Sequence, residues 1–312
     1  MYHYVRELSR SRYPEIKALL VDEFRKHLDF FTKTGVLLTG QDIVAAQQGN
    51  FDLPENAFWL TFDDGYSDHY NYVFPLLHEF GVSGTFFPPT KCMNNHILLD
   101  VNAIHFILAC TKHPSHLIER LKSVANDRVN HNDLKGFDTY WTENAVANRF
   151  DTAEVIFVKR MLQHALPANH RRAIIDQLFA EFVSVDQSAF AEELYLRPEQ
   201  VRVMNDAGME FGSHTHSHPW MDSISVEEQR SEIQNSVGYL KEMGVPMHNW
   251  IMCFPYGASN QKSQSLMTEL GASIGVGTEV RMANLERDHP MNLPRWDAND
   301  VLTHLPKSRL EE

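Results

Sequence analysis

Short apolar runs alternate with amphipathic helical patterns along much of this chain, and this order constrains the fold more than any other feature. A helical pattern stops before Gly35, and the extended run Val36-Leu37-Leu38 follows. A second helical pattern stops before Gly271 and is followed by Ile274-Gly275-Val276. Repeated strand–helix units build α/β folds with parallel strands. The sequence therefore predicts an α/β fold with the rhythm of a β/α barrel.

The alternation breaks between about residues 94 and 196. Long stretches of mixed polar and apolar residues, such as 103–108 and 155–162, take its place. We interpret the chain as one domain over residues 1–312 that contains a mostly helical insertion at about 94–196. The insertion could cover a site, form a dimer surface or serve only as scaffold.

An acidic pair ends one of the predicted strands. The run Trp59-Leu60-Thr61-Phe62 leads directly into Asp63 and Asp64, and Gly65 follows. Barrels and open α/β sheets build their sites at the carboxyl ends of strands. Two adjacent carboxylates stay ionised in a partly buried site only if a cation is near. The alternative is an ordinary turn, in which Asp caps the backbone and Gly takes a positive φ.

Histidines cluster after a second predicted strand end, in Ser213-His214-Thr215-His216-Ser217-His218-Pro219. One carboxylate and two neutral imidazoles suit Zn²⁺ or another divalent ion and leave positions open for water and substrate. In an extended segment the side chains of His214, His216 and His218 would share one side, so spacing alone does not select two of them. By itself this cluster could be a solvated loop, but together with the acidic pair it predicts a catalytic metal site.

Four segments resemble the signature motifs of the polysaccharide deacetylases, also called carbohydrate esterase family 4. The first two are the Thr61–Gly65 and Ser213–Pro219 stretches, and the others are Phe254-Pro255-Tyr256-Gly257 and Leu293-Pro294-Arg295-Trp296. They occur in family order. The resemblance implies a distorted (β/α)7 barrel and an enzyme that removes acetyl groups from carbohydrates. The family's third motif commonly carries an arginine where Cys253 and Phe254 stand here, which leaves Arg295 as the support of Asp63.

The first residues, Met1-Tyr2-His3-Tyr4-Val5, resemble the opening of a circularly permuted branch that includes poly-N-acetylglucosamine deacetylases. In that branch the opening histidine replaces the late Leu-x-His motif of other members. The resemblance therefore implies that His3 is the general acid. Leu302-Thr303-His304 matches the letters of the late motif but follows Arg295 closely, so His304 is the less favoured alternative.

The same resemblance assigns the remaining roles. Asp64, His214 and His218 would hold a divalent metal ion, with zinc favoured and cobalt, nickel or iron as alternatives. Asp63 would stay free of the metal and take a proton from water, and Arg295 would keep it ionised. Substrate and oxyanion contacts would come from Tyr256, through its backbone N–H, and from Pro255, Trp220 and Trp296. These aromatic residues could form a sugar-stacking rim or belong to the core.

Composition limits the partners. The net charge is -13, from 41 acidic and 28 basic residues, which argues against nucleic acid or an anionic membrane as main partner. A neutral or cationic substrate fits better. No apolar run approaches the roughly 18 residues of a membrane span. A homo-oligomer is compatible with the sequence.

Cysteine usage and the first residues bear on location. Cys92, Cys110 and Cys253 show no paired spacing, which predicts no disulfide framework and suits a reduced compartment. No charged-then-apolar leader precedes the first motif. We therefore expect a cytoplasmic protein.

The expected activity is metal-dependent removal of an N-acetyl group from a sugar or a polysaccharide precursor. Two alternatives stay open. The same chemistry would hydrolyse O-acetyl esters, since esters react more easily than amides. A glycan-binding protein that keeps the metal without turnover is the non-enzymatic alternative, although such a protein would need Asp64 and not Asp63.

Overall fold

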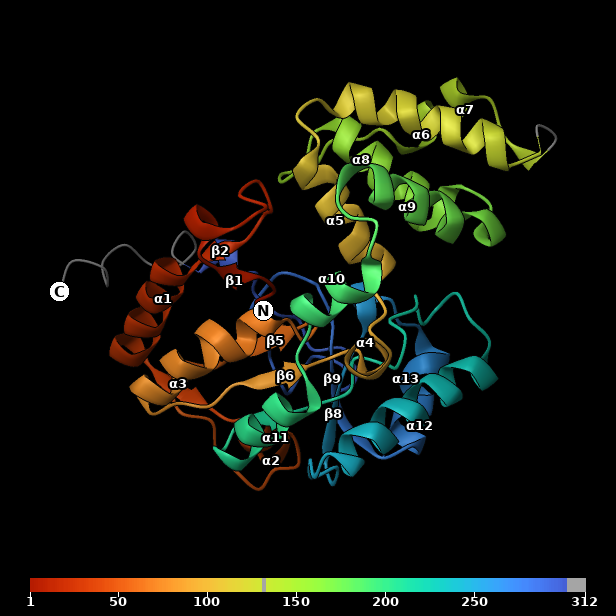
Figure 1. Ribbon diagram of the computed structural model, residues 1–312. Coiled ribbons are helices and arrows are strands. Elements are labelled where there is room, and N and C mark those ends of the chain that lie inside the picture. Colours follow the sequence, from red (N-terminus) through yellow and green to blue (C-terminus); the bar gives the residue numbers. More distant parts are fainter. Residues whose placement is uncertain (131–132, 302–312) are drawn as a thin grey trace. The chain divides into compact units, whose positions relative to one another are not determined.

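The structure is a computed structural model that describes residues 1–130 and 133–301 (Figure 1). The chain divides into two compact units. The strand-bearing unit comprises Met1–Glu7, Ala18–His96 and the chain from Glu192 onward, and the helical unit comprises Leu8–Lys17 and Ile97–Ala191. Each unit is thus assembled from segments that are distant in the sequence.

All assigned strand pairs in the described residues are parallel, and they belong to the strand-bearing unit. β1 pairs with β2, β3 pairs with β4, β6 lies between β5 and β7, and β8 pairs with β9. The bounds are Val5–Arg6 (β1), Leu19–Leu20 (β2), Val36–Leu38 (β3), Ala57–Trp59 (β4), Thr61–Asp63 (β5), Thr85–Phe87 (β6), Glu210–Phe211 (β7), Trp250–Cys253 (β8) and Ala272–Val276 (β9). The predicted α/β class is confirmed.

Isolated bridges link the β5–β6–β7 sheet and the β8–β9 pair to each other and to neighbouring segments of the chain, whereas the β3–β4 pair has no assigned bridge to them in the described residues. Three parallel bridges connect neighbouring pieces: Tyr2 with Phe62, Ser213 with Met252, and Val276 with Leu293. Beyond the last of them, the Ala298 N–H donates to the Met1 carbonyl at 3.1 Å. No closed barrel is assigned among the residues that the structure describes.

Local sequence explains where two helices of the strand-bearing unit begin or end. α12 (Val226–Glu242) opens with a capping box, in which the Ser225 hydroxyl accepts the Glu228 N–H at 3.2 Å and the Glu228 carboxylate accepts the Ser225 N–H at 2.8 Å. α3 (Phe74–Phe80) ends at Gly81, whose φ of 66° is the left-handed conformation that favours glycine. The other helices are α1 (Val21–Thr34), α2 (Gly40–Gln47), a π-helix (His69–Val73), α4 (Thr90–Asn95), α11 (Pro198–Asp206) and α13 (Gln261–Glu269), with 3₁₀ turns at Pro255–Gly257 and Ala298–Asp300.

The helical unit contains only helices among its described elements. They are a 3₁₀ turn (Leu8–Arg10), α5 (Asp100–Cys110), α6 (Pro114–Arg128), α7 (Phe137–Asn144), α8 (Ala153–Arg160), a π-helix (Met161–Ala165) and α9 (Ala168–Phe182), while α10 (Gln187–Leu194) crosses the boundary between the units. The early segment Leu8–Lys17 joins this unit through Tyr13, whose ring lies edge-on to Phe106 with centroids 5.1 Å apart. The sequence pattern does not indicate that connection.

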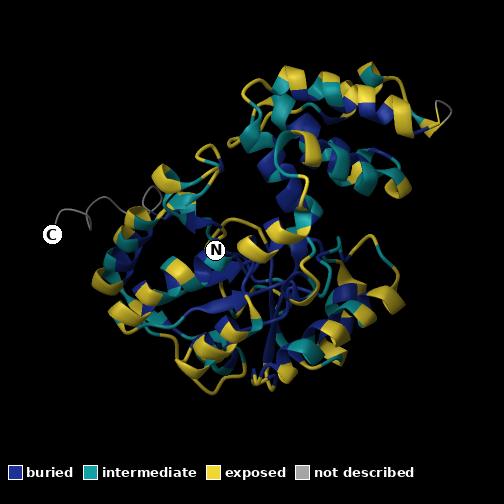
Figure 2. Cartoon of the chain, viewed as in Figure 1, coloured by how far each residue is buried: buried dark blue, intermediate teal, exposed yellow. Residues whose placement is uncertain are grey.

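Aromatic side chains form one packed layer across the three central strands. Phe62, Phe86 and Phe211 occupy matching register positions on β5, β6 and β7. The Phe62 and Phe86 rings stack with centroids 4.7 Å apart, and Phe211 packs 5.6 Å from Phe86. Side chains alternate along a strand, so Thr61 and Asp63 point away from this aromatic layer. Both are buried, and the strands around them are buried as well (Figure 2).

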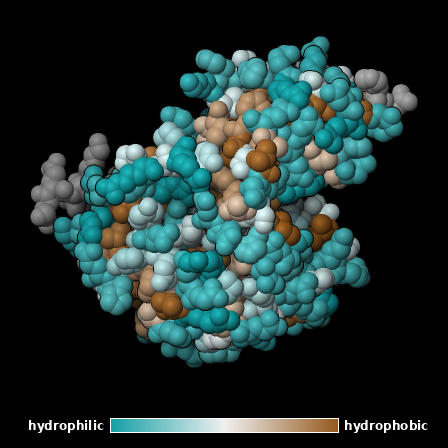
Figure 3. Space-filling model, viewed as in Figure 1, coloured by the Kyte–Doolittle hydropathy of each residue, from teal (hydrophilic) through white to brown (hydrophobic). Residues whose placement is uncertain are grey.

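Hydrophilic side chains cover most of the face seen in Figure 3, where apolar side chains gather only in small groups. Among the described residues, no helix has the length and apolar character needed to cross a membrane.

Candidate functional site

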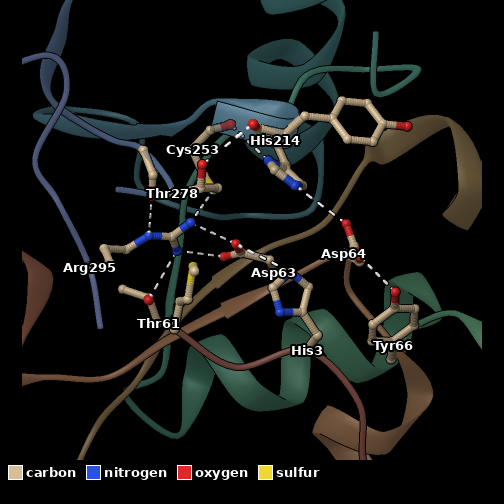
Figure 4. Close-up of polar contacts among 12 residues, drawn as sticks. His3, Thr61, Asp63, Asp64, Tyr66, His214, Cys253, Thr278 and Arg295 are labelled. Atoms are coloured by element: carbon tan, nitrogen blue, oxygen red, sulfur yellow. Dashed lines mark hydrogen bonds and ion pairs between the residues drawn. The ribbon is translucent and has the colours of Figure 1, made fainter. Parts of the chain in front are cut away.

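The acidic pair divides at the end of β5. Asp63 is the last residue of the strand, whereas Asp64 has a φ of 68° and turns the chain away. Gly65 continues the turn with a φ of 61°, and a Cβ atom there would lie 2.5 Å from the Cβ of Pro88. The two adjacent carboxylates therefore face different partners, as Figure 4 shows. Glycine is required at this position because neither its conformation nor the space admits a side chain.

Asp63 is paired with Arg295. The guanidinium donates to both carboxylate oxygens, from Nη1 to Oδ1 at 2.8 Å and from Nη2 to Oδ2 at 2.7 Å. It also donates to the Thr61 hydroxyl at 3.1 Å and to the Gly277 carbonyl at 2.9 Å. Burial acts to raise the pKa of Asp63, but Arg295 more than offsets this and holds the pKa well below its usual range. Asp63 is an ionised carboxylate at neutral pH.

Asp64 lies against two imidazoles. Its Oδ1 atom is 3.4 Å from His214 Nε2 and 3.3 Å from His218 Nε2, and all three side chains are buried. One ligand atom from each residue lies within 4.8 Å of the others. In a tetrahedral site with metal bonds of about 2.0–2.1 Å, ligand atoms lie about 3.3–3.4 Å apart. The spacing of these three side chains fits such an ion.

The hydrogen bonding of His214 agrees with that fit. Its Nδ1 atom lies 2.7 Å from the Cys253 carbonyl, which can only accept, so Nδ1 carries the proton. In the neutral imidazole the Nε2 lone pair then faces Asp64 and can bind a cation. Without an ion, burial acts to lower the pKa of His214, but Cys253 and Asp64 offset this and raise it well above its usual value. A metal ion would take the place of that Nε2 proton.

A second group that could hold a metal shares His214 and consists of Asp63, His214 and Cys253. Both oxygens of Asp63 already accept hydrogen bonds from Arg295. The Arg295 Nη2 atom also lies 3.4 Å from the Cys253 sulfur. A permanent cation at this distance opposes the binding of a second one. The group that contains Asp64 is therefore the better candidate for a metal site.

The loop that carries the histidines is not extended, and this separates His216 from the other two. Thr215 and His218 have φ values of 65° and 62°. The Thr215 hydroxyl accepts the His218 N–H at 3.0 Å. The His216 ring turns to the Thr90 hydroxyl, 2.8 Å from its Nδ1 atom. His216 is absent from both groups of potential ligands in the described chain.

Glu232 of α12 binds the backbone of the loop that carries the histidines. Its carboxylate accepts the backbone N–H groups of His216 and Ser217 at 2.9 and 2.7 Å, and the Ser217 hydroxyl at 2.6 Å. Sequence reasoning does not find this residue, because it lies in the middle of a helix whose pattern indicates only a solvated face.

His3 reaches the site from the first segment of the chain. Its Nε2 atom is 3.8 Å from Asp63 Oδ2, and its side chain is 43% exposed while that of Asp63 is 4% exposed. Backbone bonds of Tyr2 with Thr61 and Asp63, at 2.8 and 2.9 Å, hold the segment alongside β5. His3 is thus open to solvent beside a buried carboxylate. The alternative, His304, lies outside the described residues.

The aromatic residues proposed from the sequence as substrate contacts are Tyr256 in the third motif, Trp296 in the fourth motif and Trp220 directly after the histidine loop. Trp220 and Tyr256 stack with centroids 4.3 Å apart and planes 6° from parallel, and Tyr256 lies edge-on to His218 at 4.7 Å. Tyr256 follows Pro255 and has a φ of 59°, in the left-handed region. Trp296 is half-buried, and its carbonyl accepts a hydrogen bond from the Met1 nitrogen. The Trp220–Tyr256 pair thus forms an aromatic surface next to a metal-ligand candidate.

Strained backbone gathers at this site. Among the described residues other than glycine, seven have a positive φ, and four of these are Asp64, Thr215, His218 and Tyr256. Such conformations cost about 1–3 kcal/mol each and persist where the surrounding structure enforces them. Their concentration around one cluster of titratable side chains is typical of functional sites.

Sequence reasoning also missed Tyr66. Its hydroxyl donates to Asp64 Oδ2 at 2.6 Å, and its side chain is fully buried. Burial and the Asp64 carboxylate raise the pKa of Tyr66 well above its usual value, so the phenol keeps its proton. The signal that could have found it is a polar aromatic residue directly after the acidic pair, since a buried phenol needs an acceptor.

A comparison with models of protein families identifies a family. The family model described as Polysaccharide deacetylase matches residues 51–275. A search of curated proteins found no match.

Solved structures with a similar fold include a deacetylase, a protein named IcaB and a de-N-acetylase. Streptococcus pyogenes deacetylase PplD in complex with acetate has a TM-score of 0.59 and 17% identity, over 98% of this chain and 96% of that chain. IcaB from Ammonifex degensii has a TM-score of 0.56 and 16% identity, over 97% and 93%. A de-N-acetylase from Aggregatibacter actinomycetemcomitans has a TM-score of 0.55 and 16% identity, over 95% and 93%. At these identities the likeness shows the fold.

Proposed function

Because this chain belongs to the polysaccharide deacetylase family, we propose that it hydrolyses the N-acetyl group of an acetylated sugar or polysaccharide precursor with the help of a divalent metal ion. The observation that carries the proposal is the division of labour at the end of β5. Asp64 lies against two imidazoles at 3.3–3.4 Å, while Asp63 beside it is held ionised by Arg295. We also propose that the parallel strands of this unit form the distorted (β/α)7 barrel of the family.

Asp64, His214 and His218 would hold the ion, with zinc favoured and cobalt, nickel or iron as alternatives. When bound, the ion supplies Lewis acidity that lowers the pKa of a water from about 15.7 to about 7 and polarises a carbonyl. Asp63 is free to accept a proton, because Arg295 keeps it ionised without blocking every lone pair. Asp64 would thus bind the ion, and Asp63 would accept the proton.

The chain's own residues account for the proton movements. Asp63 takes a proton from the attacking water as the oxygen bonds to the acetyl carbon. The backbone N–H of Tyr256 is the proposed donor to the oxyanion that forms on the substrate. The C–N bond then breaks, and His3 gives a proton to the departing amine, so that acetate and a free amino sugar result.

The stacked rings of Trp220 and Tyr256 are the proposed platform for the sugar. Pro255 and Trp296, which lie next to Tyr256 and Arg295 in the sequence, are further proposed substrate contacts. One of the similar solved structures is described as a de-N-acetylase, which supports an amide as the substrate over an ester.

Acetate release tests the proposal. We expect purified protein to release acetate from N-acetylglucosamine oligomers, to stop after treatment with a chelator, and to resume when Zn²⁺, Co²⁺ or Ni²⁺ is returned. Asp63→Asn should lower kcat/KM by about 10²–10⁴-fold while the protein still binds the metal. Activity that survives chelation would contradict the metal mechanism.

Two comparisons address the alternatives. Faster release from O-acetylated than from matched N-acetylated sugars would identify an esterase. Protein that binds the oligomers and releases no acetate under any of these metals would be a glycan-binding protein.

A further inference from the structure

Tyr66 combines complete burial with a short hydrogen bond to a proposed metal ligand. Its hydroxyl lies 2.6 Å from Asp64 Oδ2, whereas the other carboxylate oxygen, Oδ1, faces His214 and His218 (Figure 4). The two oxygens of one carboxylate are thus used for two different purposes. The phenol occupies one oxygen and leaves the other for an ion.

The Tyr66 ring is held in a slot formed by two other tyrosines. Tyr4 stacks on it with centroids 3.9 Å apart and planes 19° from parallel, and Tyr195 lies on it at 6.3 Å and 14°. The backbone is fixed as well, because Tyr66 forms an antiparallel bridge with Tyr195 and the Leu196 N–H donates to the Gly65 carbonyl at 2.8 Å. Packing and backbone contacts therefore hold the Tyr66 ring in addition to its hydrogen bond with Asp64.

We propose that Tyr66 is a positioning residue that locks the Asp64 carboxylate with one oxygen toward the two histidines, and thereby sets both the affinity and the coordination number of the metal site. This inference rests on the proposed function, since it takes Asp64, His214 and His218 as ligands. It assigns Tyr66 no contact with substrate and no part in proton transfer.

The physical basis is the freedom that Asp64 would have without the hydroxyl. Carboxylates bind metals through one oxygen or through both. The side chain could then rotate and present both oxygens to the ion, or leave the two histidines. Partners that orient metal ligands typically change metal affinity by about 10–100-fold when they are removed.

The test is Tyr66→Phe, which removes the hydroxyl and keeps the ring in its slot. Zn²⁺ affinity is measured by competition with a coloured chelator, and the Co²⁺-loaded protein is examined by visible absorption spectroscopy. We expect the Zn²⁺ affinity to fall by about 10–100-fold and the Co²⁺ absorption bands to change in intensity and position, because the number of coordinating oxygens changes.

Tyr2→Phe is the matched control. Tyr2 is also a buried tyrosine of the strand-bearing unit, but its hydroxyl pairs with His27 Nδ1 at 3.0 Å and not with a proposed ligand. This variant should keep the Zn²⁺ affinity and the Co²⁺ spectrum of the unchanged protein. An equal loss of affinity in Tyr2→Phe and Tyr66→Phe would mean that general destabilisation is responsible, and would overturn the proposal.

A second variant keeps the proposal testable if Tyr66→Phe does not fold. Tyr4→Leu keeps the Tyr66 hydroxyl but removes the Tyr4 ring that stacks 3.9 Å from Tyr66 and the polar interaction between the two side chains. We expect a smaller loss of Zn²⁺ affinity in the same direction. Unchanged affinity and an unchanged Co²⁺ spectrum in whichever of the two variants folds would overturn the assignment.

The result can be separated from a failure of the proposed function. If the unchanged protein binds Zn²⁺ and Asp64→Ala does not, the ligand set holds and the Tyr66 variants test the inference alone. If Asp64→Ala binds Zn²⁺ as well as the unchanged protein does, the ligand set is wrong and the proposed function fails with it.

Discussion

Arg295 and Asp63 form a buried two-point ion pair across 232 positions of sequence, with N–O distances of 2.8 and 2.7 Å. The side chains are only 5% and 4% exposed. Each charge therefore depends on the other, because neither has water to replace its partner. Asp63, the proposed base, is therefore kept ionised by a contact that forms only when the chain folds.

Arg295→Met should unfold the protein more easily and shift its pH dependence. Removing one partner leaves a buried carboxylate, which costs about 3–5 kcal/mol of unfolding free energy near neutral pH. Burial is the largest effect on the pKa of Asp63, and only the smaller opposing effects of His3 and His214 remain, so the pKa and the acidic limb of kcat/KM should move to higher pH. Denaturant unfolding and a pH–rate profile measure the two effects.

The sign of the stability effect also changes. The low pKa of Asp63 in the folded protein contributes stability above the unfolded value of about 3.9, and this is lost as pH falls toward the folded value. In Arg295→Met the folded pKa exceeds the unfolded one, so stability should decrease as pH rises through about 4. Arg281→Met is the control, because Arg281 is 43% exposed and pairs with Glu279 and Asp288 away from Asp63, so the loss of stability should be smaller and the kcat/KM profile should stay unchanged.

His3→Ala and His304→Ala should separate the two candidates for the general acid. We expect His3→Ala to lower kcat by about 10²–10⁴-fold, since no other proton donor is proposed for the departing amine. His304→Ala should keep kcat unchanged. Steady-state kinetics with N-acetylglucosamine oligomers gives both values, and the opposite pattern would transfer the role to His304.

Metal affinity should depend on pH through His214. The pKa of His214 is raised well above its usual value in the metal-free protein, so an ion must displace a proton at neutral pH. Zn²⁺ affinity should therefore rise about tenfold per pH unit between pH 6 and 8, which is the slope for one displaced proton. Competition titrations at pH 6, 7 and 8 measure it, and an affinity that is constant over this range would contradict the expectation.

Trp220→Ala should weaken substrate binding more than catalysis. Trp220 stacks on Tyr256 at 4.3 Å and has no part in the proposed proton transfers. The variant removes one of the two rings on which the sugar is proposed to stack. If that stacking contributes as much as an aromatic pair, about 0.5–1.5 kcal/mol, KM should rise about two- to tenfold while kcat stays similar. Trp141→Ala serves as control, because this tryptophan is 40% exposed in the helical unit. A fall in kcat with unchanged KM would remove Trp220 from the sugar platform.

Much of the fold follows from local pattern. The apolar run before Asp63 predicts β5, and the capping box at Ser225 and Glu228 predicts the start of α12. Both signals act within a few residues. The inclusion of Leu8–Lys17 in the helical unit depends on the contact between Tyr13 and Phe106, which no local pattern encodes.

The candidate site divides in the same way. The acidic pair and the histidine cluster are indicated by residue type and position, whereas His3 and Arg295 are identified through the resemblance to the family. The structure brings His3, Asp63, Asp64, His214 and Arg295 together. Spacing could not exclude His216, because its direction depends on the positive φ values of Thr215 and His218. Glu232 and Tyr66 act on backbone and on a ligand through contacts that only the folded chain creates.

The pairing of Asp63 with Arg295 also bears on how the protein is made. Asp63 leaves the ribosome long before Arg295, and the larger segment of the helical unit, Ile97–Ala191, is synthesised between them. Until the later segment arrives, β5 would have to bury a carboxylate without its cation. Nascent chains cut before Arg295 should therefore leave this strand accessible to proteases, and the helical unit has time to fold first.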